Sequence, residues 1–341
     1  MVHASLARVG AKPPAATAER LASQALGIAR RALSQAVESS RLQGLLDAAG
    51  IPNLVLKGAA VEMLAYGQLG RKDAWDIDLL VSPGAVQAAR EILEHEGYAL
   101  AQPEGLRPAQ FKTFVELARE CEFSHRQNGM TVELHWRLAD GPVLLPGMSV
   151  ASPSQSVTLT ETLRLRTLAP EELFAYLCVH GAMHGWSRLK WLADLGALMG
   201  GESPESVEYL YRRSLALGAG LCSVQALLLC ERLLSVPMPP ALPDELHRSR
   251  RAAWLVRIGL KTMVGGGERE LEARPFASAR ILLAQFALCG TWPNVIAQLR
   301  YRALSVHDRV HAPLPRGLRF LYPVLRAPLW LWRRLAKASV R

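Results

Sequence analysis

The sequence predicts an α+β protein, with short strands and helices mixed in its first half and helices almost alone in its second half. Three observations predict this class. They are helical spacing of apolar residues before residue 50, short apolar runs between residues 53 and 138, and nearly continuous helical patterns from Pro170 onward. The chain has 341 residues, 50% of them hydrophobic, so it is long enough to form two compact domains.

The first expected element is a long helix over about residues 18–49, which Gly50 ends. The apolar run at residues 53–57 is typical of a buried strand. Gly58 follows it and leads into a helix that reaches about Tyr66. We therefore expect a strand, a tight glycine turn and a helix in this order.

A second strand is expected over residues 76–81, and Ser82 with Pro83 then starts a helix that runs to about Glu96. Three further strands are expected at residues 98–100, 120–126 and 130–138. The pair Asn128-Gly129 separates the last two strands, and it is a common hairpin turn. The first half thus predicts an α/β unit that ends in a hairpin.

Residues 141–156 are rich in Pro, Gly and Ser and are interpreted as the connection out of this unit, with two short strands over 156–167. The helices that follow are interrupted at glycine and proline runs, including Gly265-Gly266-Gly267, which we interpret as a loop. The predicted divisions are a helical segment at 1–50, a catalytic domain at 51–168 and a helical domain at 169–341.

The composition limits the class of partner and the cellular compartment. The formal charge of +10 and the pI near 9.7 favour an anionic partner such as a nucleotide, a nucleic acid or a membrane surface. Five widely spaced cysteines without a CxxC pair predict buried, reduced thiols in a cytoplasmic protein. No run of about 18 apolar residues occurs, which disfavours a membrane span.

The pair Asp76 and Asp78 is the strongest candidate for chemistry. Side chains two residues apart share one face of a strand, so both carboxylates can hold one cation. Magnesium prefers oxygen ligands and commonly joins a few carboxylates to substrate phosphates. Glu133, on another predicted strand, is the third candidate ligand, with Glu122 and His135 as substitutes in the site.

An ordered set of motifs resembles the uncharacterised nucleotidyltransferase family of the DNA polymerase beta-like superfamily. The motifs are Leu56-Lys57-Gly58, Arg71, Asp76-Ile77-Asp78-Leu79-Leu80-Val81, Glu96-Gly97-Tyr98, Val132-Glu133-Leu134-His135-Trp136, Leu177-Cys178-Val179-His180-Gly181-Ala182-Met183-His184-Gly185-Trp186 and Leu189-Lys190-Trp191-Leu192-Ala193-Asp194. The likeness covers about residues 50–200. It implies a small mixed sheet with flanking helices, in which Asp76, Asp78 and the third acid bind magnesium and a nucleoside triphosphate.

The glycine motif departs from the pattern of the superfamily. Members usually carry Gly-Gly or Gly-Ser ahead of the acids, where this chain has Lys57-Gly58-Ala59. We expect the amides of Gly58 and Ala59, at a helix N-terminus, to contact phosphate with support from Lys57. Either Arg71 or Lys72 is expected to supply a further cation.

His180 and His184 lie one helical turn apart and face the same way. Because no HExxH pattern is present, a zinc protease is excluded. The favoured interpretation is a pair of hydrogen-bonded structural histidines between the domains, and a contact to the nucleotide or the acceptor is the alternative. Asp194 is a candidate partner for one of them.

The sequence therefore predicts a magnesium-dependent enzyme, with manganese as the alternative ion, that moves a nucleoside monophosphate from ATP or another triphosphate to a hydroxyl or phosphate acceptor. A small molecule, a sugar or a modified peptide is favoured over nucleic acid as the acceptor, in a polysaccharide or peptide natural-product pathway. The alternatives are a toxin-like enzyme that modifies transfer RNA and a non-catalytic scaffold that keeps the fold.

The C-terminal segment combines aromatic and basic residues. It contains Arg319-Phe320-Leu321-Tyr322 and Leu329-Trp330-Leu331-Trp332-Arg333-Arg334. Packing of these aromatics onto the helical domain is the favoured interpretation, because Pro323 and Pro328 shorten any continuous amphipathic face. Peripheral contact with an anionic membrane is the competing hypothesis.

Overall fold

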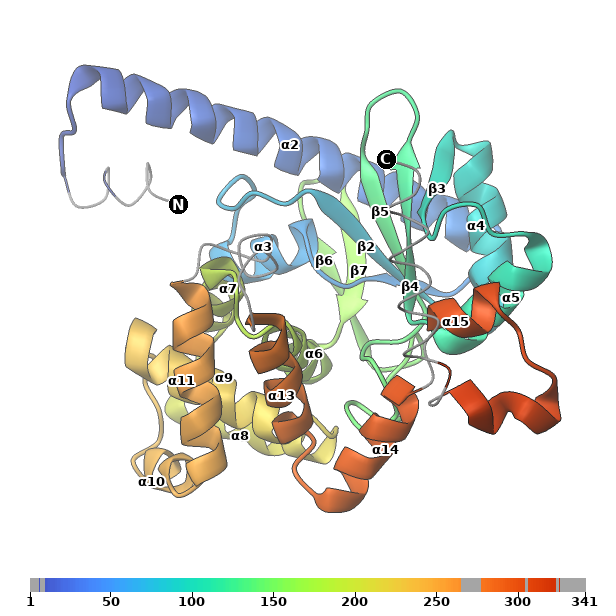
Figure 1. The fold of residues 1–341 in the computed structure, drawn as a ribbon. Coiled ribbons are helices and arrows are strands. Elements are labelled where there is room, and N and C mark those ends of the chain that lie inside the picture. The colour runs from blue at the N-terminus through green and yellow to red at the C-terminus, as the bar shows by residue number, and fades with distance from the viewer. Residues whose placement is uncertain (1–5, 7–9, 265–276, 304–305, 323–324, 326–341) are drawn as a thin grey trace.

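The computed structural model describes residues 6, 10–264, 277–303, 306–322 and 325. A five-stranded sheet with helices packed around it lies beside a large group of helices, and a long N-terminal helix extends along one side (Figure 1). The α+β class predicted from the sequence is therefore confirmed, including the mixed sheet that the family resemblance implied.

The N-terminal helix α2 spans Ala15–Ala48, three residues further toward the N-terminus than expected. Its C-terminal half packs on the sheet through buried residues such as Leu42, while Leu26 in its N-terminal half is 54% exposed. Strand β1 (Asn53–Val55) and helix α3 (Ala59–Tyr66) follow, as predicted, on either side of the glycine turn.

The sheet has the strand order β1-β2-β5-β4-β3. The other strands are β2 (Asp76–Val81), β3 (Tyr98–Gln102), β4 (Glu120–His125) and β5 (Thr131–His135). Only the β2–β5 pair is parallel, and the remaining neighbours are antiparallel. The parallel pair places Asp78 directly opposite Glu133, which brings together acids that are far apart in the sequence.

Strict alternation gives the sheet two different faces. On β2, Ile77, Leu79 and Val81 belong to the apolar core beneath α2, whereas Asp76 and Asp78 point to the opposite face. The same alternation on β4 and β5 buries their apolar residues in that core and places their acids on the opposite face. All the acidic candidates of the three central strands therefore share one face.

Two helices complete the core beneath this sheet. The 3₁₀ turn η1 (Pro83–Ala85) leads into α4 (Val86–His95), as the Ser-Pro start predicted. Helix α5 (Pro108–Leu117) was not predicted, although Pro108 occupies its first turn and Phe111 is buried in the core. Short amphipathic helices between strands give weak periodic patterns, which explains the omission.

A separate two-stranded sheet, β6 (Ser154–Thr158) and β7 (Arg164–Leu168), joins the first half of the chain to the helices. The helices after it are α6 (Pro170–Met183), α7 (Leu189–Met199), α8 (Pro204–Ala216), α9 (Leu221–Leu234), α10 (Ala241–His247), α11 (Arg250–Met263), α13 (Ala277–Leu288), α14 (Trp292–Ala303), α15 (Val306–His311) and the 3₁₀ helix η2 (Arg316–Leu321). The Gly265-Gly266-Gly267 run lies outside the described residues.

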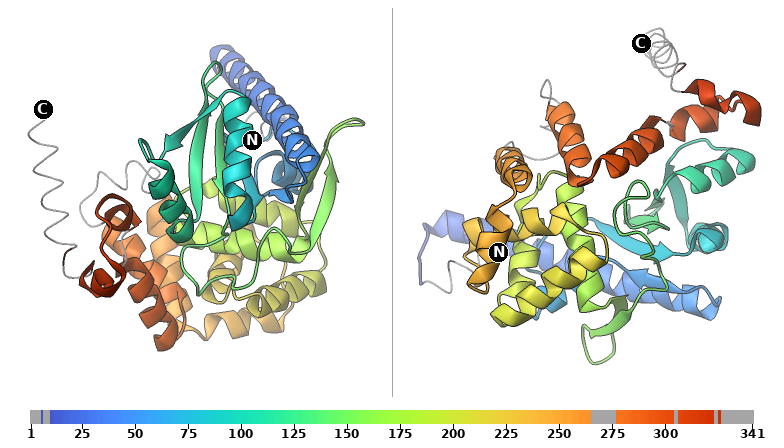
Figure 2. Two further views of the ribbon diagram at one scale, coloured as in Figure 1. Left: turned by 90° about the vertical axis from the view of Figure 1, so that its right-hand side faces the viewer. Right: turned by 90° about the horizontal axis from the view of Figure 1, so that it is seen from below.

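The helical region shares its apolar core with the other side of the sheet. Leu54, Leu56 and Leu80 from β1, its C-terminal end and β2 pack in one cluster with residues of α6, α7, α9, α11 and α13. The α14–α15 segment turns back to the sheet region (Figure 2), where Gln110 Nε2 donates to the carbonyl oxygen of Val310 at 3.1 Å. The domain limits remain a prediction, since this core crosses the proposed boundary at residue 168.

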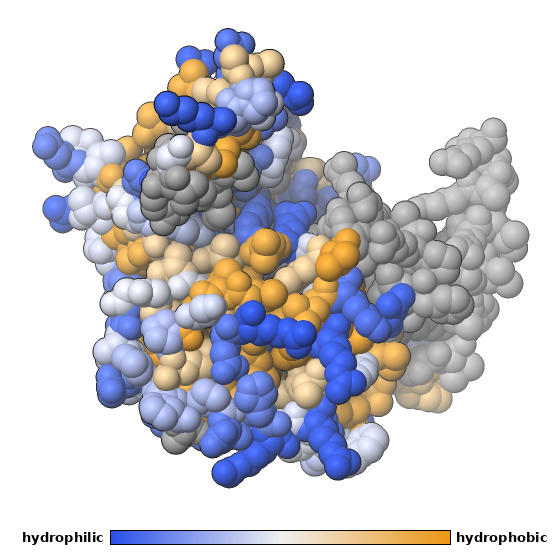
Figure 3. All heavy atoms as spheres, turned by 90° about the vertical axis from the view of Figure 1, so that its left-hand side faces the viewer, coloured by the Kyte–Doolittle hydropathy of each residue, from blue (hydrophilic) through white to orange (hydrophobic). Residues whose placement is uncertain are grey.

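The surface and the C-terminal end bear on the membrane hypothesis. A band of apolar side chains crosses one face beneath the N-terminal helix, with hydrophilic side chains on both sides (Figure 3). None of the helices described here has the length and apolar character needed to cross a bilayer. In the C-terminal segment Phe320 is 71% exposed and Tyr322 is buried, and the tryptophan-arginine cluster at 329–334 lies outside the described residues.

Candidate functional site

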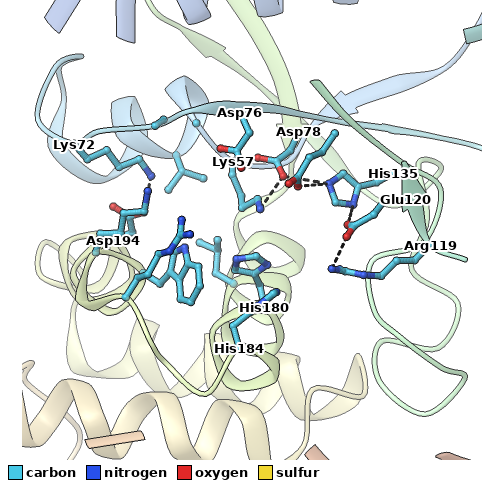
Figure 4. A pocket seen from close by; sticks show the side chains of 18 residues that line it. Lys57, Lys72, Asp76, Asp78, Arg119, Glu120, His135, His180, His184 and Asp194 are labelled. Atoms are coloured by element: carbon cyan, nitrogen blue, oxygen red, sulfur yellow. Dashed lines mark hydrogen bonds and ion pairs between the residues drawn. The ribbon is translucent and has the colours of Figure 1, made fainter. Parts of the chain in front are cut away.

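A cavity lies between the acidic face of the sheet and the helices α6 and α7 (Figure 4). It is lined mainly by charged side chains and histidines. The lining residues are Lys57, Gly58, Val61, Lys72, Ala74, Asp76, Asp78, Arg119, Glu120, Glu133, His135, Leu177, His180, His184, Arg188, Lys190, Trp191 and Asp194. Most residues that the sequence analysis singled out meet here, although they come from five segments of the chain.

The two aspartates of β2 differ in exposure. Asp76 is partly exposed at the start of the strand, whereas Asp78 is 2% exposed. Lys57 and His135 both contact the Asp78 carboxylate and contribute to its burial. Glu133 lies opposite Asp78 on β5 and remains partly exposed.

Lys57 neutralises Asp78 directly. Its ammonium nitrogen lies 2.7 Å from Asp78 Oδ1, and the backbone amide of Leu56 donates to the carbonyl oxygen of Asp78 at 3.0 Å. Burial lowers the pKa of Lys57, but the charges of the surrounding groups, Asp78 first, together raise it by more, so the pKa lies above its ordinary value. Lys57 is therefore charged and points into the acid cluster.

His135 is the centre of a buried acidic network. Its Nε2 lies 3.1 Å from Asp78 Oδ1 and 3.4 Å from Glu133 Oε2, and its Nδ1 lies 2.9 Å from Glu120 Oε2. Burial lowers the pKa of His135, but hydrogen bonds to these three carboxylates raise it to about 10. Lys57 and His135 thus supply the positive charge that keeps the acids together.

Arg119 and Glu120 extend this network, and neither was predicted. Arg119 contacts Glu120 Oε1 at 2.8 Å and Asp140 Oδ1 at 3.1 Å. Burial raises the pKa of Glu120, but contacts with His135 and Arg119 lower it by a larger amount, so that it lies at about 2. The sequence signal that could have revealed these residues is the adjacent Arg-Glu pair at the start of β4. This strand lies beside β5, which carries Glu133 and His135.

The donor set fits a divalent cation held by oxygen ligands. One ligand atom each from Asp78, Glu133 and His135 lie within 4.8 Å of one another, and Asp76 shares their face of the sheet. Magnesium favours the carboxylates over an imidazole, which leaves His135 to orient Asp78 and Glu133. Glu122, also opposite Glu133, has a pKa raised by burial and by Glu133.

A second group of charges lies at the other end of the cavity. Lys72 Nζ lies 2.6 Å from Asp194 Oδ2, and the hydroxyl of Tyr66 donates to Asp194 Oδ1 at 3.0 Å. Lys190 Nζ donates to the carbonyl oxygen of Asp73 at 2.8 Å, and burial followed by the charge of Lys72 lowers its pKa. Lys72 and Tyr66 are therefore contacts of Asp194 that the sequence analysis did not foresee, and the pairing of Asp194 with a histidine stays a prediction.

The loop before β2 separates the two candidate cations. Glu62 Oε1 accepts hydrogen bonds from the backbone amides of Arg71 and Lys72, which fixes the loop against α3. Lys72 lines the cavity and Arg71 does not. At the glycine turn, Gly58 lines the cavity at a φ of +63°, a left-handed value that favours glycine, while Ala59 is buried behind it.

Helix α6 forms the wall opposite the acids. His180 is 9% exposed, and its Nε2 has no hydrogen-bond partner among the described residues. Burial, then the charge of Lys57, holds the pKa of His180 well below its ordinary value, so its imidazole is neutral. The favoured expectation of a fully hydrogen-bonded structural histidine is wrong for His180. The ring of His184 lies 4.8 Å from it.

The mixed sheet, with acids on adjacent parallel strands and a helical wall opposite them, is the nucleotidyltransferase-like architecture that the family resemblance implied. The chain belongs to the uncharacterised nucleotidyltransferase family, whose model matches residues 1–235. The match extends beyond the 50–200 range that carries the sequence motifs, and it confirms the resemblance.

The chain is similar to an antigenic nucleotidyltransferase-like protein from Paracoccidioides brasiliensis, with 14% identity and a TM-score of 0.35. That comparison covers 61% of this chain and 95% of the other. No curated protein matches the chain.

Proposed function

We propose that this protein transfers a nucleoside monophosphate from a nucleoside triphosphate to an acceptor, with magnesium held by Asp76, Asp78 and Glu133. The observation that carries the proposal is the meeting of these acids with the cations Lys57, Lys72 and Lys190 in one cavity. A bound magnesium ion would neutralise phosphate charge in this site. Manganese is the alternative ion.

The two ends of the cavity suit different parts of the triphosphate. Lys57 already lies 2.7 Å from Asp78, so it is placed to contact a phosphate that binds beside the acids. Lys72 and Lys190 lie at the other end, where they suit the terminal phosphates. The Gly58 amide at the N-terminus of α3 offers a further phosphate contact.

The proposed nucleotidyl transfer needs only the nucleoside triphosphate and the acceptor as reactants. The acceptor oxygen forms a bond to the α-phosphorus, the bond from that phosphorus to the bridging oxygen breaks, and pyrophosphate leaves. The proton of a hydroxyl acceptor passes to a carboxylate of the site and then to water. A small molecule, a sugar or a modified peptide is the preferred acceptor.

One observation favours a second candidate function. The ammonium group of Lys57 occupies the position beside Asp78 that a cation would take, so a non-catalytic member of the family could keep its acids paired in this way. That protein would hold the fold as a scaffold without metal-dependent turnover.

Calorimetry separates the two candidates. The enzyme should bind a nucleoside triphosphate more tightly with magnesium than without it, and Asp76→Asn should abolish the difference while the melting temperature changes little. Glu208→Gln, a charge-matched change on the exposed α8 surface, is the control. A triphosphate affinity that does not depend on magnesium, or a fully active Asp76→Asn variant, contradicts the proposal.

Transfer itself requires labelled triphosphates and cell extract. We expect label from the α-phosphate, and none from the γ-phosphate, to enter a product that depends on magnesium. Label in transfer RNA would indicate the toxin-like alternative, and label in a small molecule, a glycan or a peptide would identify the preferred acceptor class.

A further inference from the structure

Helix α6 carries two buried polar atoms that have no hydrogen-bond partner among the described residues. They are the hydroxyl of Tyr176 and Nε2 of His180, on residues that are 1% and 9% exposed. The two residues lie one helical turn apart, and their ring centroids are 5.9 Å apart. Unpartnered buried polar groups are rare in folded proteins, so each of them requires an explanation.

Only one of these two residues lines the cavity. His180 faces it from α6, opposite Lys57 (Figure 4). The ring of Trp191 stands edge-to-face with the imidazole, with 5.0 Å between the ring centroids. Tyr176 lies one turn earlier on the helix and is not part of the lining. The cavity position makes a bound molecule the natural partner for His180 and not for Tyr176.

The chemistry of His180 suits a hydroxyl group better than a phosphate group. Phosphates are matched by cations, and Lys57, Lys72 and Lys190 already supply three of them in the cavity. The imidazole of His180 is neutral because burial and the nearby charge of Lys57 hold its pKa low. A hydroxyl can donate to or accept from Nε2, so it suits either tautomer, whereas a phosphate oxygen can only accept.

We propose that His180 Nε2 forms a hydrogen bond with the acceptor's hydroxyl and that the acceptor is therefore an alcohol rather than a phosphate. This inference rests on the proposed nucleotidyl transfer and narrows its acceptor. The hydroxyl oxygen lies between α6 and the acids, and the bond that forms joins this oxygen to the α-phosphorus. Pyrophosphate leaves and the hydroxyl proton passes to a carboxylate, so the product is a phosphodiester.

The first test compares three variants. His180→Leu removes the unpartnered atom at similar size, and His180→Gln restores an amide near the position of Nε2. Tyr176→Phe removes the other unpartnered atom, on a side chain that does not line the cavity. We measure the melting temperature, the affinity for magnesium and triphosphate by calorimetry, and transfer of α-labelled monophosphate into cell extract.

We expect His180→Leu to keep triphosphate affinity within about twofold and to lose transfer by roughly tenfold or more. Its melting temperature should rise, because an unmet polar group is replaced by an apolar one. His180→Gln should recover part of the transfer, and Tyr176→Phe should gain stability with unchanged transfer. The product should give the phosphorus NMR signal of a phosphodiester.

Three results overturn the inference while leaving the proposed function intact. Triphosphate affinity that falls together with transfer assigns His180 to the nucleotide. Unchanged transfer in His180→Leu makes His180 a core residue, and a phosphoanhydride product makes the acceptor a phosphate. If the wild type neither binds triphosphate with magnesium nor transfers label, the proposed function fails first and the inference fails with it.

Discussion

The two walls of the cavity differ in whether their buried polar groups have partners within the protein. On the strand wall, Asp78 is only 2% exposed, yet Lys57 and His135 neutralise it within 3.1 Å. On the helix wall, the Tyr176 hydroxyl and His180 Nε2 are buried and have no partner in the described parts of the chain. On the strand wall the buried charges contact one another, whereas on the helix wall His180 Nε2 has hydrogen-bonding capacity left for a ligand.

Because of this difference, substitutions on the two walls have different effects on stability. Removing one member of a satisfied buried charge network leaves its partners uncompensated and lowers stability. Removing an unpartnered polar atom relieves a desolvation penalty and raises stability. Substitutions on the two walls should therefore change the free energy of unfolding in opposite directions.

The largest effect is expected at Asp78. Asp78→Asn should lower the free energy of unfolding by about 3 kcal/mol, because Lys57 and His135 then share a buried site with one negative charge fewer. Urea unfolding measures the change, and adding Lys57→Met should recover part of it. If Asp78→Asn leaves stability unchanged, the strand wall is not held by this network.

Lys57 provides the next largest effect, on binding. Lys57→Ala should weaken triphosphate binding by about 1.5–3 kcal/mol through loss of a charge-assisted contact. Magnesium alone should bind at least as well, because the ammonium group beside Asp78 is removed. Calorimetry with Lys112→Ala, an exposed lysine outside the cavity, is the control. Equal triphosphate affinity for wild type and Lys57→Ala removes Lys57 from the site.

The helix wall predicts a specific pH dependence. The folded state holds the pKa of His180 well below its ordinary 6.5, through burial and the charges of Lys57, His184, Arg119 and His135. Below pH 6.5 the unfolded chain binds a proton at His180 that the folded state does not bind. The free energy of unfolding is therefore highest above pH 6.5 and decreases as the pH falls. The stability gain of His180→Leu should therefore grow below pH 6.5, by at most about 1.4 kcal/mol per pH unit.

Melting temperatures of the wild type and His180→Leu between pH 8 and pH 5 measure this effect. His95→Gln is the matched control, since the side chain of His95 is 87% exposed on α4. A difference between wild type and His180→Leu that stays constant over this range would show that His180 takes up its proton in the folded state.

The smallest effect is expected outside both walls. Arg31 of α2 contacts Asp73 at 2.8 Å and lies 4.9 Å from the ring centroid of Trp75, but the side chains of Arg31 and Asp73 are 44% and 36% exposed. Exposed pairs contribute little, so Arg31→Ala should cost less than about 1 kcal/mol. A larger loss in urea unfolding would mean that the loop before β2 depends on α2.

The sequence predicted the strands and the acidic pair because local patterns determine them. Alternation of side chains along Asp76-Ile77-Asp78 places two acids on one face of the strand, and glycines mark both ends of the neighbouring helix α3. The hairpin around Asn128-Gly129 was also predictable, and its strands β4 and β5 pair antiparallel. These features require only a few adjacent residues.

The contacts of the site were not predictable in the same way. Asp194 pairs with Lys72, 122 residues earlier, and His135 pairs with Asp78 through the parallel register of β2 and β5. Such partners depend on how strands and helices pack, which a local pattern does not encode. Arg119 and Glu120 were missed for the same reason, since their importance arises from the proximity of β4 to β5.

The apolar cluster that joins Leu54, Leu56 and Leu80 to α6, α9 and α11 has a consequence for cooperativity. Because the strand wall and the helix wall rest on one core, neither can melt alone without exposing the apolar side of the other. Unfolding should then be a single transition that abolishes both walls together. A fragment ending at residue 235 would lack the α11 and α13 surfaces of that core, so we expect it to aggregate.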